Sequence, residues 1–229
     1  MKITLVILTK NEVEGVRVVV PKIPKDSVDE IITIDGRSTD GTKEFIESQG
    51  IKVITQEKMG RGEAFRLAFA STDSDALVFF SPDGNEDTKD IKKFKPLLEA
   101  GNDIVIASRM MRGARNEEDD KLFKWSKWIN QTFTLMINMF WNRGKYITDT
   151  INGFRAVTRR SWSIIRPDGP GYTIEYQSSI RAFKNGLKLA EFPTYEGDRI
   201  GPGGAPRMST GIAFIKCLWR EILLSFKEI

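Results

Sequence analysis

The chain contains no histidine and a single cysteine, Cys217, among its 229 residues. Without histidine, the common His-based zinc, haem and Ser-His-Asp chemistries are excluded, and one cysteine cannot form an internal disulfide. Any acid, base or metal-binding role must therefore fall to carboxylates, lysines, tyrosines or the lone thiol.

Long hydrophobic runs are also missing. The N-terminal segment MKITLVILTKNE has a short apolar stretch, but it lacks a cleavage-site pattern and is shorter than a usual signal peptide. No run approaches the roughly 20 apolar residues that a membrane-spanning helix needs. We therefore expect a chain that does not cross a membrane by itself.

The overall composition is that of one large folded domain, expected over residues 1–229, because 40% of the residues are hydrophobic. The net charge of +4 is compatible with anionic substrates or an anionic membrane surface. Nucleic-acid binding is not expected, because the positive charges are dispersed and the aromatic residues gather in an apolar segment.

Short apolar segments alternate with helical patterns along the first half of the chain. Strands are expected at residues 2–8, 30–34, 51–54, from 76, and at 103–107, with later ones near 154–157 and 188–192. This alternation predicts a right-handed, mostly parallel α/β sheet flanked by helices. Polar residues follow several strand ends, which predicts a binding crevice at one edge of the sheet; they are Thr9, Asp35, Asp83 and Arg109.

The segment ALVFFSPDGNED at residues 76–87 is the strongest single signal. Its apolar run suits a strand buried on both faces, and Asp83, Asn85, Glu86 and Asp87 follow it. Such oxygen ligands favour Mg²⁺ or Mn²⁺ carrying substrate phosphates. Alternatively, Asp87 caps the helix expected over DIKKFKPLLEA, and the spacing alone leaves both interpretations open.

The later part of the chain changes in character. Residues 121–144 are dense in Trp, Phe and Met with Lys and Arg toward both ends, which suits an amphipathic helix in a membrane interface or a helix packed on the core. Residues 194–209 are rich in Gly and Pro, which predicts a mobile flap bearing Arg199 and Arg207. Residues 210–229 predict an amphipathic helix that docks on the core, on a membrane or on another subunit.

Six motifs stand in order along the chain: LTKNE (8–12), IDGRSTDGT (34–42), GRGEAFR (60–66), SPDGNED (81–87), ASR (107–109) and DTINGFRAVTR (149–159). Together they resemble the family 2 glycosyltransferases with the GT-A fold, most closely the polyprenol-phosphate sugar synthases. The resemblance implies a nucleotide-sugar-binding half at residues 1–110, an acceptor-side half at 111–209 and a C-terminal amphipathic helix at 210–229.

For the donor, the resemblance implies that polar residues of the first motifs line the nucleotide pocket: Thr9, Asn11, Glu12 and Asp35. A carboxylate such as Asp35 can accept hydrogen bonds from a base or ribose, although it can also stabilise a turn. Gly60 and Gly62 then allow close approach of the backbone to the donor, and Arg61 or Arg66 faces its phosphates.

The resemblance also implies a metal site. Asp83 falls at the first carboxylate of the family's DxD motif, Asn85 replaces the second, and Asp87 is a candidate further ligand. The Mg²⁺ or Mn²⁺ ion is expected to bridge the donor diphosphate and stabilise the charge on the leaving group.

A phosphate acceptor is already an anion, so attack on the sugar with inversion needs no strong base. It needs cations, and the candidates are Arg109, Arg112, Arg199 and Arg207. Asp149 is expected to contact sugar hydroxyls or to orient an arginine, with an ion pair to Arg155 as the alternative. Glu175 is read as a solvated helix residue or as an acceptor-side residue.

The implied activity is transfer of a hexose from a GDP-mannose or UDP-glucose type donor to a polyprenyl or dolichyl phosphate, at the cytoplasmic face of a membrane contacted through residues 121–144. A soluble transferase acting on a glycan, a protein or a small phosphorylated acceptor is the alternative. A non-catalytic nucleotide-sugar-binding protein is a third interpretation. Self-association and a membrane partner stay open.

Overall fold

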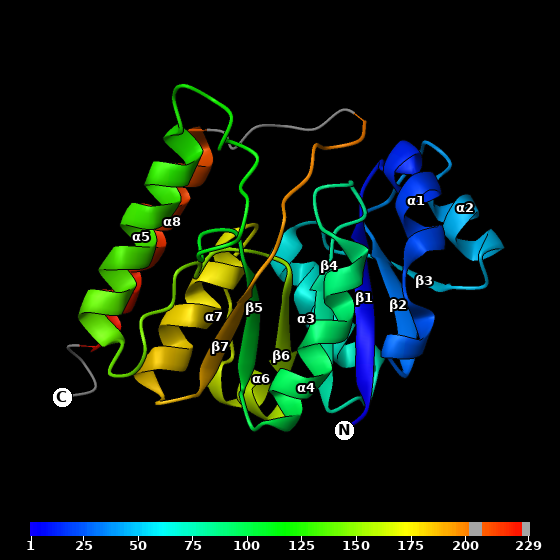
Figure 1. Ribbon diagram of the computed structural model, residues 1–229. Helices are drawn as coiled ribbons and strands as arrows, with labels where there is room; N and C mark the ends of the chain where they lie inside the picture. Colours follow the sequence, from blue (N-terminus) through cyan, green and yellow to red (C-terminus); the bar gives the residue numbers. More distant parts are fainter. Residues whose placement is uncertain (202–207, 226–229) are drawn as a thin grey trace.

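The computed structural model describes residues 1–201 and 208–225 (Figure 1). Within them, seven strands form one sheet in the order β3-β2-β1-β4-β6-β5-β7. The strands are β1 (Ile3–Thr9), β2 (Glu30–Asp35), β3 (Lys52–Thr55), β4 (Ala76–Phe80), β5 (Ile104–Ser108), β6 (Arg155–Thr158) and β7 (Leu189–Pro193). The expected α/β fold is confirmed, with each strand within about one residue of its predicted position.

The described helices connect these strands and cover the sheet. They are α1 (Val13–Val19), η1 (Val20–Lys22), η2 (Lys25–Ser27), α2 (Thr42–Ser48), α3 (Arg61–Ser71), η3 (Thr88–Lys93), α4 (Phe94–Glu99), α5 (Trp125–Trp141), α6 (Arg159–Ile165), α7 (Thr173–Lys184) and α8 (Met208–Ser225). The helix expected after residue 87 is divided into η3 and α4. Pro96 has no N–H and so cannot continue a regular α-helical ladder through this point.

The sheet is mostly parallel, and β6 is its antiparallel member, paired with β4 on one side and β5 on the other. Parallel strands bring their carboxyl ends to one edge of the sheet, which lies at the top in Figure 1. Because β6 runs the opposite way, it begins at that same edge. The residues that precede β6 are therefore placed beside the residues that follow β4 and β5, at the same edge as the ends of β1 and β2.

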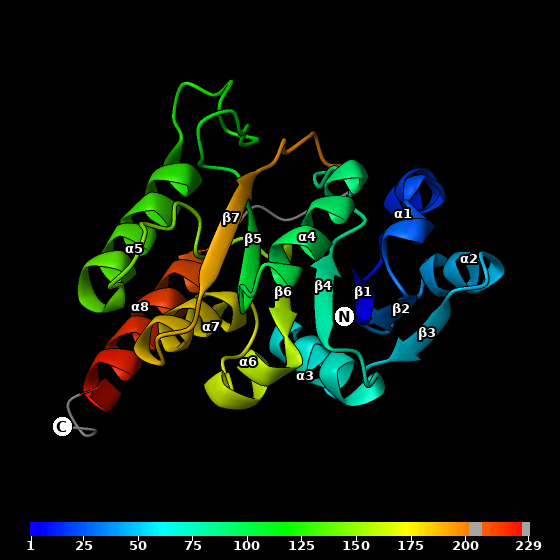
Figure 2. The ribbon, with the colours of Figure 1, turned by 60° about the horizontal axis from the view of Figure 1, so that its bottom comes forward.

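Two apolar layers form the core, one on each face of the sheet. Alternate residues of β1 divide between them: Leu5 and Ile7 pack on the side of α1, α2 and α4, whereas Val6 and Leu8 pack on the side of α3, α6 and α7 (Figure 2). These strands are buried on both faces, which explains why they read as nearly continuous apolar runs in the sequence.

A third apolar cluster joins α5, α7 and α8 beyond the β7 edge of the sheet. Phe133 and Ile137 of α5 meet Tyr176 and Ile180 of α7 and Phe214 of α8. Glu221 of α8 accepts hydrogen bonds from α7 side chains, which fixes α8 in place. Of the predicted docking modes of α8, the structure shows packing on the core, while the opposite surface of α5 and α8 is left exposed.

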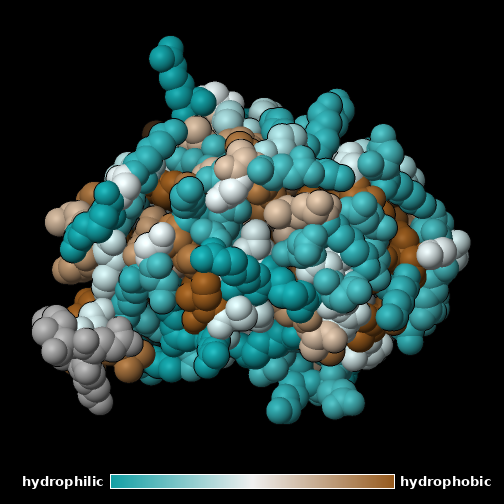
Figure 3. All heavy atoms as spheres, turned by 90° about the horizontal axis from the view of Figure 1, so that it is seen from below, coloured by the Kyte–Doolittle hydropathy of each residue, from teal (hydrophilic) through white to brown (hydrophobic). Residues whose placement is uncertain are grey.

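No helix in residues 1–201 and 208–225 is long and apolar enough to cross a membrane. The end of the molecule where the parallel strands begin is covered mainly by hydrophilic side chains (Figure 3). Arg207 and residues 202–207 of the predicted flap lie outside the described residues, as do residues 226–229 of the predicted terminal helix.

Candidate active site

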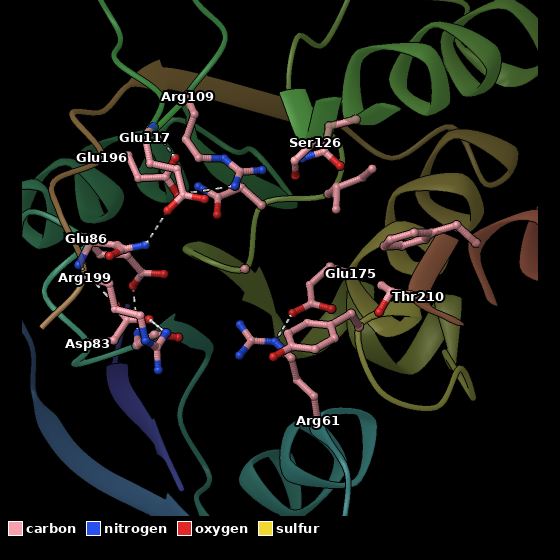
Figure 4. A pocket seen from close by; sticks show the side chains of 18 residues that line it. Arg61, Asp83, Glu86, Arg109, Glu117, Ser126, Glu175, Glu196, Arg199 and Thr210 are labelled. Carbon is pink, nitrogen blue, oxygen red and sulfur yellow. Dashed lines mark hydrogen bonds and ion pairs between the residues drawn. The ribbon is translucent and has the colours of Figure 1, made fainter. Parts of the chain in front are cut away.

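Two neighbouring cavities open at the edge of the sheet where β1, β2 and β4 end. The first, here called the strand-end pocket, has a volume of about 480 Å³ and includes Thr9, Glu12 and Gly60 in its wall. The second, the helix-side pocket, has a volume of about 540 Å³ and is lined by residues that range along the chain from the start of α3 to α8 (Figure 4). Residues common to both walls are Arg61, Ser81, Asp83, Tyr172 and Arg199. The two cavities therefore form one continuous site.

Asp35 and Asn11 do not line the strand-end pocket, but they make hydrogen bonds within the turns that form it. Buried Asp35 accepts hydrogen bonds from Thr9 Oγ1 at 3.1 Å and from the Ser38 amide at 2.9 Å. Asn11 Oδ1 accepts from the Thr39 amide at 2.9 Å. In this arrangement Asp35 plays the turn-stabilising role that was the alternative to base or ribose contact.

The glycines of the GRGEAFR motif have different surroundings. Gly60 has a positive φ of 123° and lines the strand-end pocket. Gly62 faces the other way: a Cβ there would lie 2.2 Å from the Gly169 carbonyl oxygen, so this glycine allows α3 to pack against the loop before α7. The close approach at Gly62 is therefore to protein backbone.

The two arginines of the same motif also point to different places. Arg61 points into the site, whereas Arg66 donates to Glu63 at 3.0 Å and to the Pro167 carbonyl at 3.3 Å, outside the walls of both pockets. Of the two arginines proposed to face a phosphate, only Arg61 is placed to do so. α3 begins at Arg61, two residues before its predicted start.

The turn after β4 presents oxygen atoms to both pockets. Asp83 is buried; its Oδ1 accepts from the Asn85 amide at 3.2 Å, and its Oδ2 accepts from Arg199 at 2.6 Å. Asn85 Oδ1 is buried without a hydrogen-bond partner. Asp87 instead accepts from the Lys89 amide at 2.9 Å and caps η3, so the structure places it in the capping role and not beside Asp83.

Whether this turn fits a divalent cation depends on how many ligands the ion takes from the protein. No group of three or more His, Cys, Asp or Glu residues in the described part of the chain is arranged to hold a metal. Mg²⁺, however, usually takes only one or two carboxylates from the protein and completes its shell with substrate phosphates and water. Asp83, with the unpartnered oxygen of Asn85 beside it, fits that requirement.

A buried ion pair joins α3 to α7 across the helix-side pocket. Arg61 Nε donates to Glu175 Oε1, and Glu175 Oε2 is buried without a partner (Figure 4). A Cβ at Gly153 would lie 2.1 Å from the Arg61 guanidinium, so only glycine leaves room for this pair. The interpretation of Glu175 as a solvated helix residue is wrong, because its helix face is turned toward the site.

Arg109 is held in the same pocket by two carboxylates. Its Nε and Nη2 donate to Asp149 at 2.8 and 3.2 Å, and its Nη1 donates to Glu196 at 3.4 Å. Burial alone raises the pKa of Asp149, but the Arg109 guanidinium outweighs it and holds the pKa below its ordinary value. Asp149 therefore orients an arginine, as one reading of the motif predicted.

The alternative partner of Asp149, Arg155, lies elsewhere. It is fully buried, and it donates to the carbonyl oxygens of Asn152 at 2.6 Å, Thr150 at 3.0 Å and Glu175 at 2.9 Å. Burial lowers the pKa of Arg155 to about 10. The proposed Asp149–Arg155 ion pair is not formed; Arg155 instead fixes the loop before β6 against α7.

Two further carboxylates line the helix-side pocket: Glu196, which no motif singled out, and Glu86, which belongs to the predicted oxygen-ligand cluster after β4. Glu196 accepts from Asn116 Nδ2 at 2.7 Å and from the Glu117 amide at 3.1 Å, and burial raises its pKa. Burial and the neighbouring Asp83 raise the pKa of Glu86 well above its ordinary value. Glu196 could not be found from spacing, because it reaches Arg109 only through the pairing of β7 with β5.

Of the remaining candidate cations, some line the pockets and others lie outside them. Arg199 lies in the wall of both pockets, but Arg112 is exposed and lies outside both. Lys124 and Lys127, two of the cations near the start of α5, pair with Asp119. In the described part of the chain, the arginines that line the two pockets are Arg61, which the sequence assigned to the donor, Arg109 and Arg199.

An apolar groove along α5 and α8 lies next to the helix-side pocket. Ser126 of α5 and Phe214 of α8 line the pocket, and the next residues of the same helices line the groove, which has a volume of about 690 Å³. Its wall is formed by Trp125, Trp128, Ile129, Thr132, Phe133, Met136, Phe140, Gly211, Ile215, Leu218, Trp219 and Ile222. Several of these side chains are largely exposed, including Trp125 at 64% and Trp219 at 59%.

Comparison with known proteins identifies the class. Residues 4–163 match the family model described as glycosyl transferase family 2, and the chain belongs to this family. The match includes the Arg109–Asp149 pair and every residue that lines the strand-end pocket except Gly171, Tyr172 and Arg199.

Two curated relatives come from Haloferax volcanii. The chain is 29% identical over 189 residues to the glycosyltransferase AglJ, and the match covers 81% of this chain and 60% of AglJ. It is 26% identical over 224 residues to a dolichyl-phosphate hexose transferase, covering 96% of this chain and 94% of the relative. The chain therefore spans about three fifths of the length of AglJ and nearly all of the second relative.

Among solved structures, the chain is similar to glucosyl-3-phosphoglycerate synthase from Mycobacterium tuberculosis in complex with Mn²⁺, UDP and phosphoglyceric acid. The TM-score is 0.73 at 22% identity, covering 96% of this chain and 78% of that one. At this identity the likeness concerns the fold, which is the GT-A arrangement expected from the motifs.

Proposed function

We propose that the protein transfers a hexose from a nucleotide sugar to a polyprenyl phosphate at a membrane surface. The observation that carries this proposal is that a polar, arginine-bearing pocket and an exposed apolar groove are lined by neighbouring residues of the same two helices, α5 and α8. A lipid phosphate has the same two parts, an anionic head and an apolar chain. The curated relative named dolichyl-phosphate hexose transferase, which matches almost over its full length, supports this reading.

The donor is assigned to the strand-end pocket, within residues 1–110. Thr9 and Glu12 offer hydrogen-bonding groups to a nucleoside, and Gly60 leaves the backbone open to close approach. Asp35 holds Thr9 in place by accepting its hydrogen bond, and Asn11 accepts a hydrogen bond from the Thr39 amide of the neighbouring turn. Asp83 and Asn85 would hold a Mg²⁺ or Mn²⁺ ion, which supplies charge stabilisation to the leaving nucleoside diphosphate.

The acceptor phosphate is assigned to the helix-side pocket, within residues 111–209 and the cations that face them. Arg61 and Arg109 are fixed by ion pairs with Glu175 and Asp149, and a guanidinium carries five N–H donors, so further donors remain for a phosphate. A phosphate oxygen attacks the anomeric carbon directly, and the nucleoside diphosphate leaves from the opposite side. We therefore expect inversion without a general base.

Membrane contact is assigned to α5 and to α8, which occupies most of residues 210–229. Both helices turn aromatic and aliphatic side chains outward, and Met139 is 68% exposed. Exposed cations accompany them, including Lys121, Arg143 and Lys216. Large apolar residues beside cations suit an interface with anionic lipids.

A second candidate function is transfer to a small phosphorylated acceptor. The carboxylates and amides of the helix-side pocket, including Glu117 and Asn130, favour it because they can bind the hydroxyl groups of a soluble substrate. Under this reading the apolar groove belongs to contacts with another protein surface, and activity is indifferent to lipid.

The test is incorporation of radiolabelled sugar into the organic phase, using GDP-mannose or UDP-glucose, Mn²⁺ or Mg²⁺, and polyprenyl phosphate. Label that follows one donor and is lost in Asp83→Ala supports the lipid acceptor. Transfer of label only to water-soluble phosphorylated acceptors supports the second candidate. Nucleotide binding without any transfer contradicts both.

A further inference from the structure

We propose that Arg199 is a built-in substitute for the divalent cation: in the donor-free protein its guanidinium neutralises Asp83, and the cation displaces it when it binds together with a nucleoside diphosphate. This inference rests on the proposed function, because it concerns the same site. It makes Arg199 a residue that couples cation binding to donor binding.

The contacts of Arg199 are those of a cation in a carboxylate site. Its Nη1 donates to Asp83 Oδ2 at 2.6 Å, and its Nη2 donates to Glu12. The side chains of Asp83 and Glu12 are only 12% and 15% exposed, so both charges need compensation where they lie. Figure 4 shows Arg199 directly beside Asp83, on the wall that the two pockets share.

The backbone around Arg199 is fastened to the same turn that carries Asp83. The Ile200 amide donates to the Asp83 carbonyl at 2.6 Å, and the Gly197 amide donates to the Asn85 carbonyl at 2.8 Å. A Cβ at Gly84, whose φ is +91°, would lie 2.8 Å from the Ile200 side chain. Because the backbone is held in this way, displacement of the guanidinium requires rotation of the Arg199 side chain alone.

Competition follows from this geometry. Asp83 Oδ2 cannot accept a hydrogen bond from the guanidinium and bind a divalent cation at the same time. A cation that binds alone must therefore first break the charge-assisted hydrogen bonds of Arg199 to Asp83 and Glu12. A nucleoside diphosphate in the strand-end pocket offers the released guanidinium new acceptor oxygens. The two ligands therefore bind with positive coupling, and the coupling is reciprocal.

The test measures Mn²⁺ binding to the full chain by electron paramagnetic resonance, with and without UDP or GDP, in the wild type and in Arg199→Gln. Without nucleotide, we expect Mn²⁺ to bind Arg199→Gln roughly tenfold more tightly, the effect of removing a charge-assisted competitor. With nucleotide this difference should shrink or reverse, because the variant lacks the arginine that meets the diphosphate.

Two controls keep the result interpretable. Arg160→Gln removes an ion pair of 2.9 Å with Asp103 at the opposite edge of the sheet and should leave Mn²⁺ affinity unchanged. Arg199→Met tests the same competition with another neutral side chain, and thermal unfolding verifies that each variant is folded.

Equal Mn²⁺ affinity in the wild type and in both Arg199 variants overturns the inference while leaving the proposed transferase function intact. Mn²⁺ binding that is undetectable in all variants, even with either nucleoside diphosphate, overturns the inference and also the metal dependence assigned to the donor site. Tighter binding in the Arg199 variants that disappears with nucleotide supports the inference.

Discussion

The strand-end pocket and the α5–α8 groove both border the helix-side pocket but are built in opposite ways. The strand-end pocket rests on short turns after buried parallel strands, and hydrogen bonds such as Asp35 to Thr9 hold its polar side chains. The groove is formed by α5 and α8, two helices that are far apart in the sequence but adjacent in the fold. Both expose large apolar residues to solvent.

The two regions therefore bind in different ways: the strand-end pocket through a few precisely placed polar groups, the groove through a broad apolar surface. In the strand-end pocket a shift of one side chain removes a defined contact, because each polar group is held by a small number of specific hydrogen bonds. In the groove many apolar contacts of similar strength add up, so single substitutions should have graded effects. The predictions below test this contrast.

The largest effect is expected at Asp83. Asp83→Asn should lower turnover on the order of 10³-fold, because it removes the negative charge that a divalent cation requires. Asp87→Asn is the matched control: Asp87 caps η3, asparagine can cap it equally well, and both turnover and stability should change little. Steady-state rates with saturating Mn²⁺ measure the turnover of both variants. A similar loss in the two variants would contradict the separation of these carboxylates.

The second-largest effect is expected at the Arg109–Asp149 pair, in the helix-side pocket between the two regions. Asp149→Asn should destabilise the fold by about 3 kcal/mol, because it leaves the buried Arg109 short of a counter-charge. Glu47→Gln, which removes an exposed pair with Lys43, should change stability little. Urea unfolding measures the difference, and equal midpoints would show that the Arg109–Asp149 pair contributes nothing to stability.

In the groove, Trp128→Glu combined with Trp219→Glu should weaken binding to anionic vesicles roughly tenfold or more. Val18→Glu places the same charge on an exposed apolar residue of α1 and should leave vesicle binding unchanged. Co-sedimentation with vesicles measures the effect. Unchanged sedimentation of the double variant would argue that this surface meets a protein instead.

The smallest effect is expected at Glu86. Because its pKa in the folded protein lies above the ordinary 4.5, the unfolded chain releases the proton first, and wild-type stability falls as pH rises from 4.5 through the raised pKa. Glu86→Gln removes this loss, so it should melt a few degrees higher than the wild type near pH 8. Melting curves at pH 4.5 and pH 8 test it; a difference that is the same at both pH values would mean that folding does not raise the pKa of Glu86.

Much of the fold could be predicted because buried strands carry their own signal. The runs that become β1 and β4 are apolar on both faces, and polar turns end them. The antiparallel direction of β6 carries no comparable signal, since a strand of the same composition can run either way. That direction brings the loop containing Asp149 into the site.

Within the site, the sequence predicted residues that lie next to strand ends, such as Thr9 and Asp83. It misplaced residues whose partners are remote. Arg66 is one turn from Arg61, and only the packing of α3 against α7 decides which guanidinium meets Glu175. Glu196 was missed for the same reason, because it depends on the place of β7 in the sheet.

By itself, the sequence determined the alternation of strands and helices, the polar turns at one sheet edge and the amphipathic character of α5 and α8. These properties follow from local composition and periodicity, which each segment carries independently. Only the tertiary structure decided that Asp149 pairs with Arg109, that Glu175 faces Arg61 and that Arg199 holds Asp83. Buried charges must find partners, and the choice among partners depends on which backbone segments the folded sheet brings within reach.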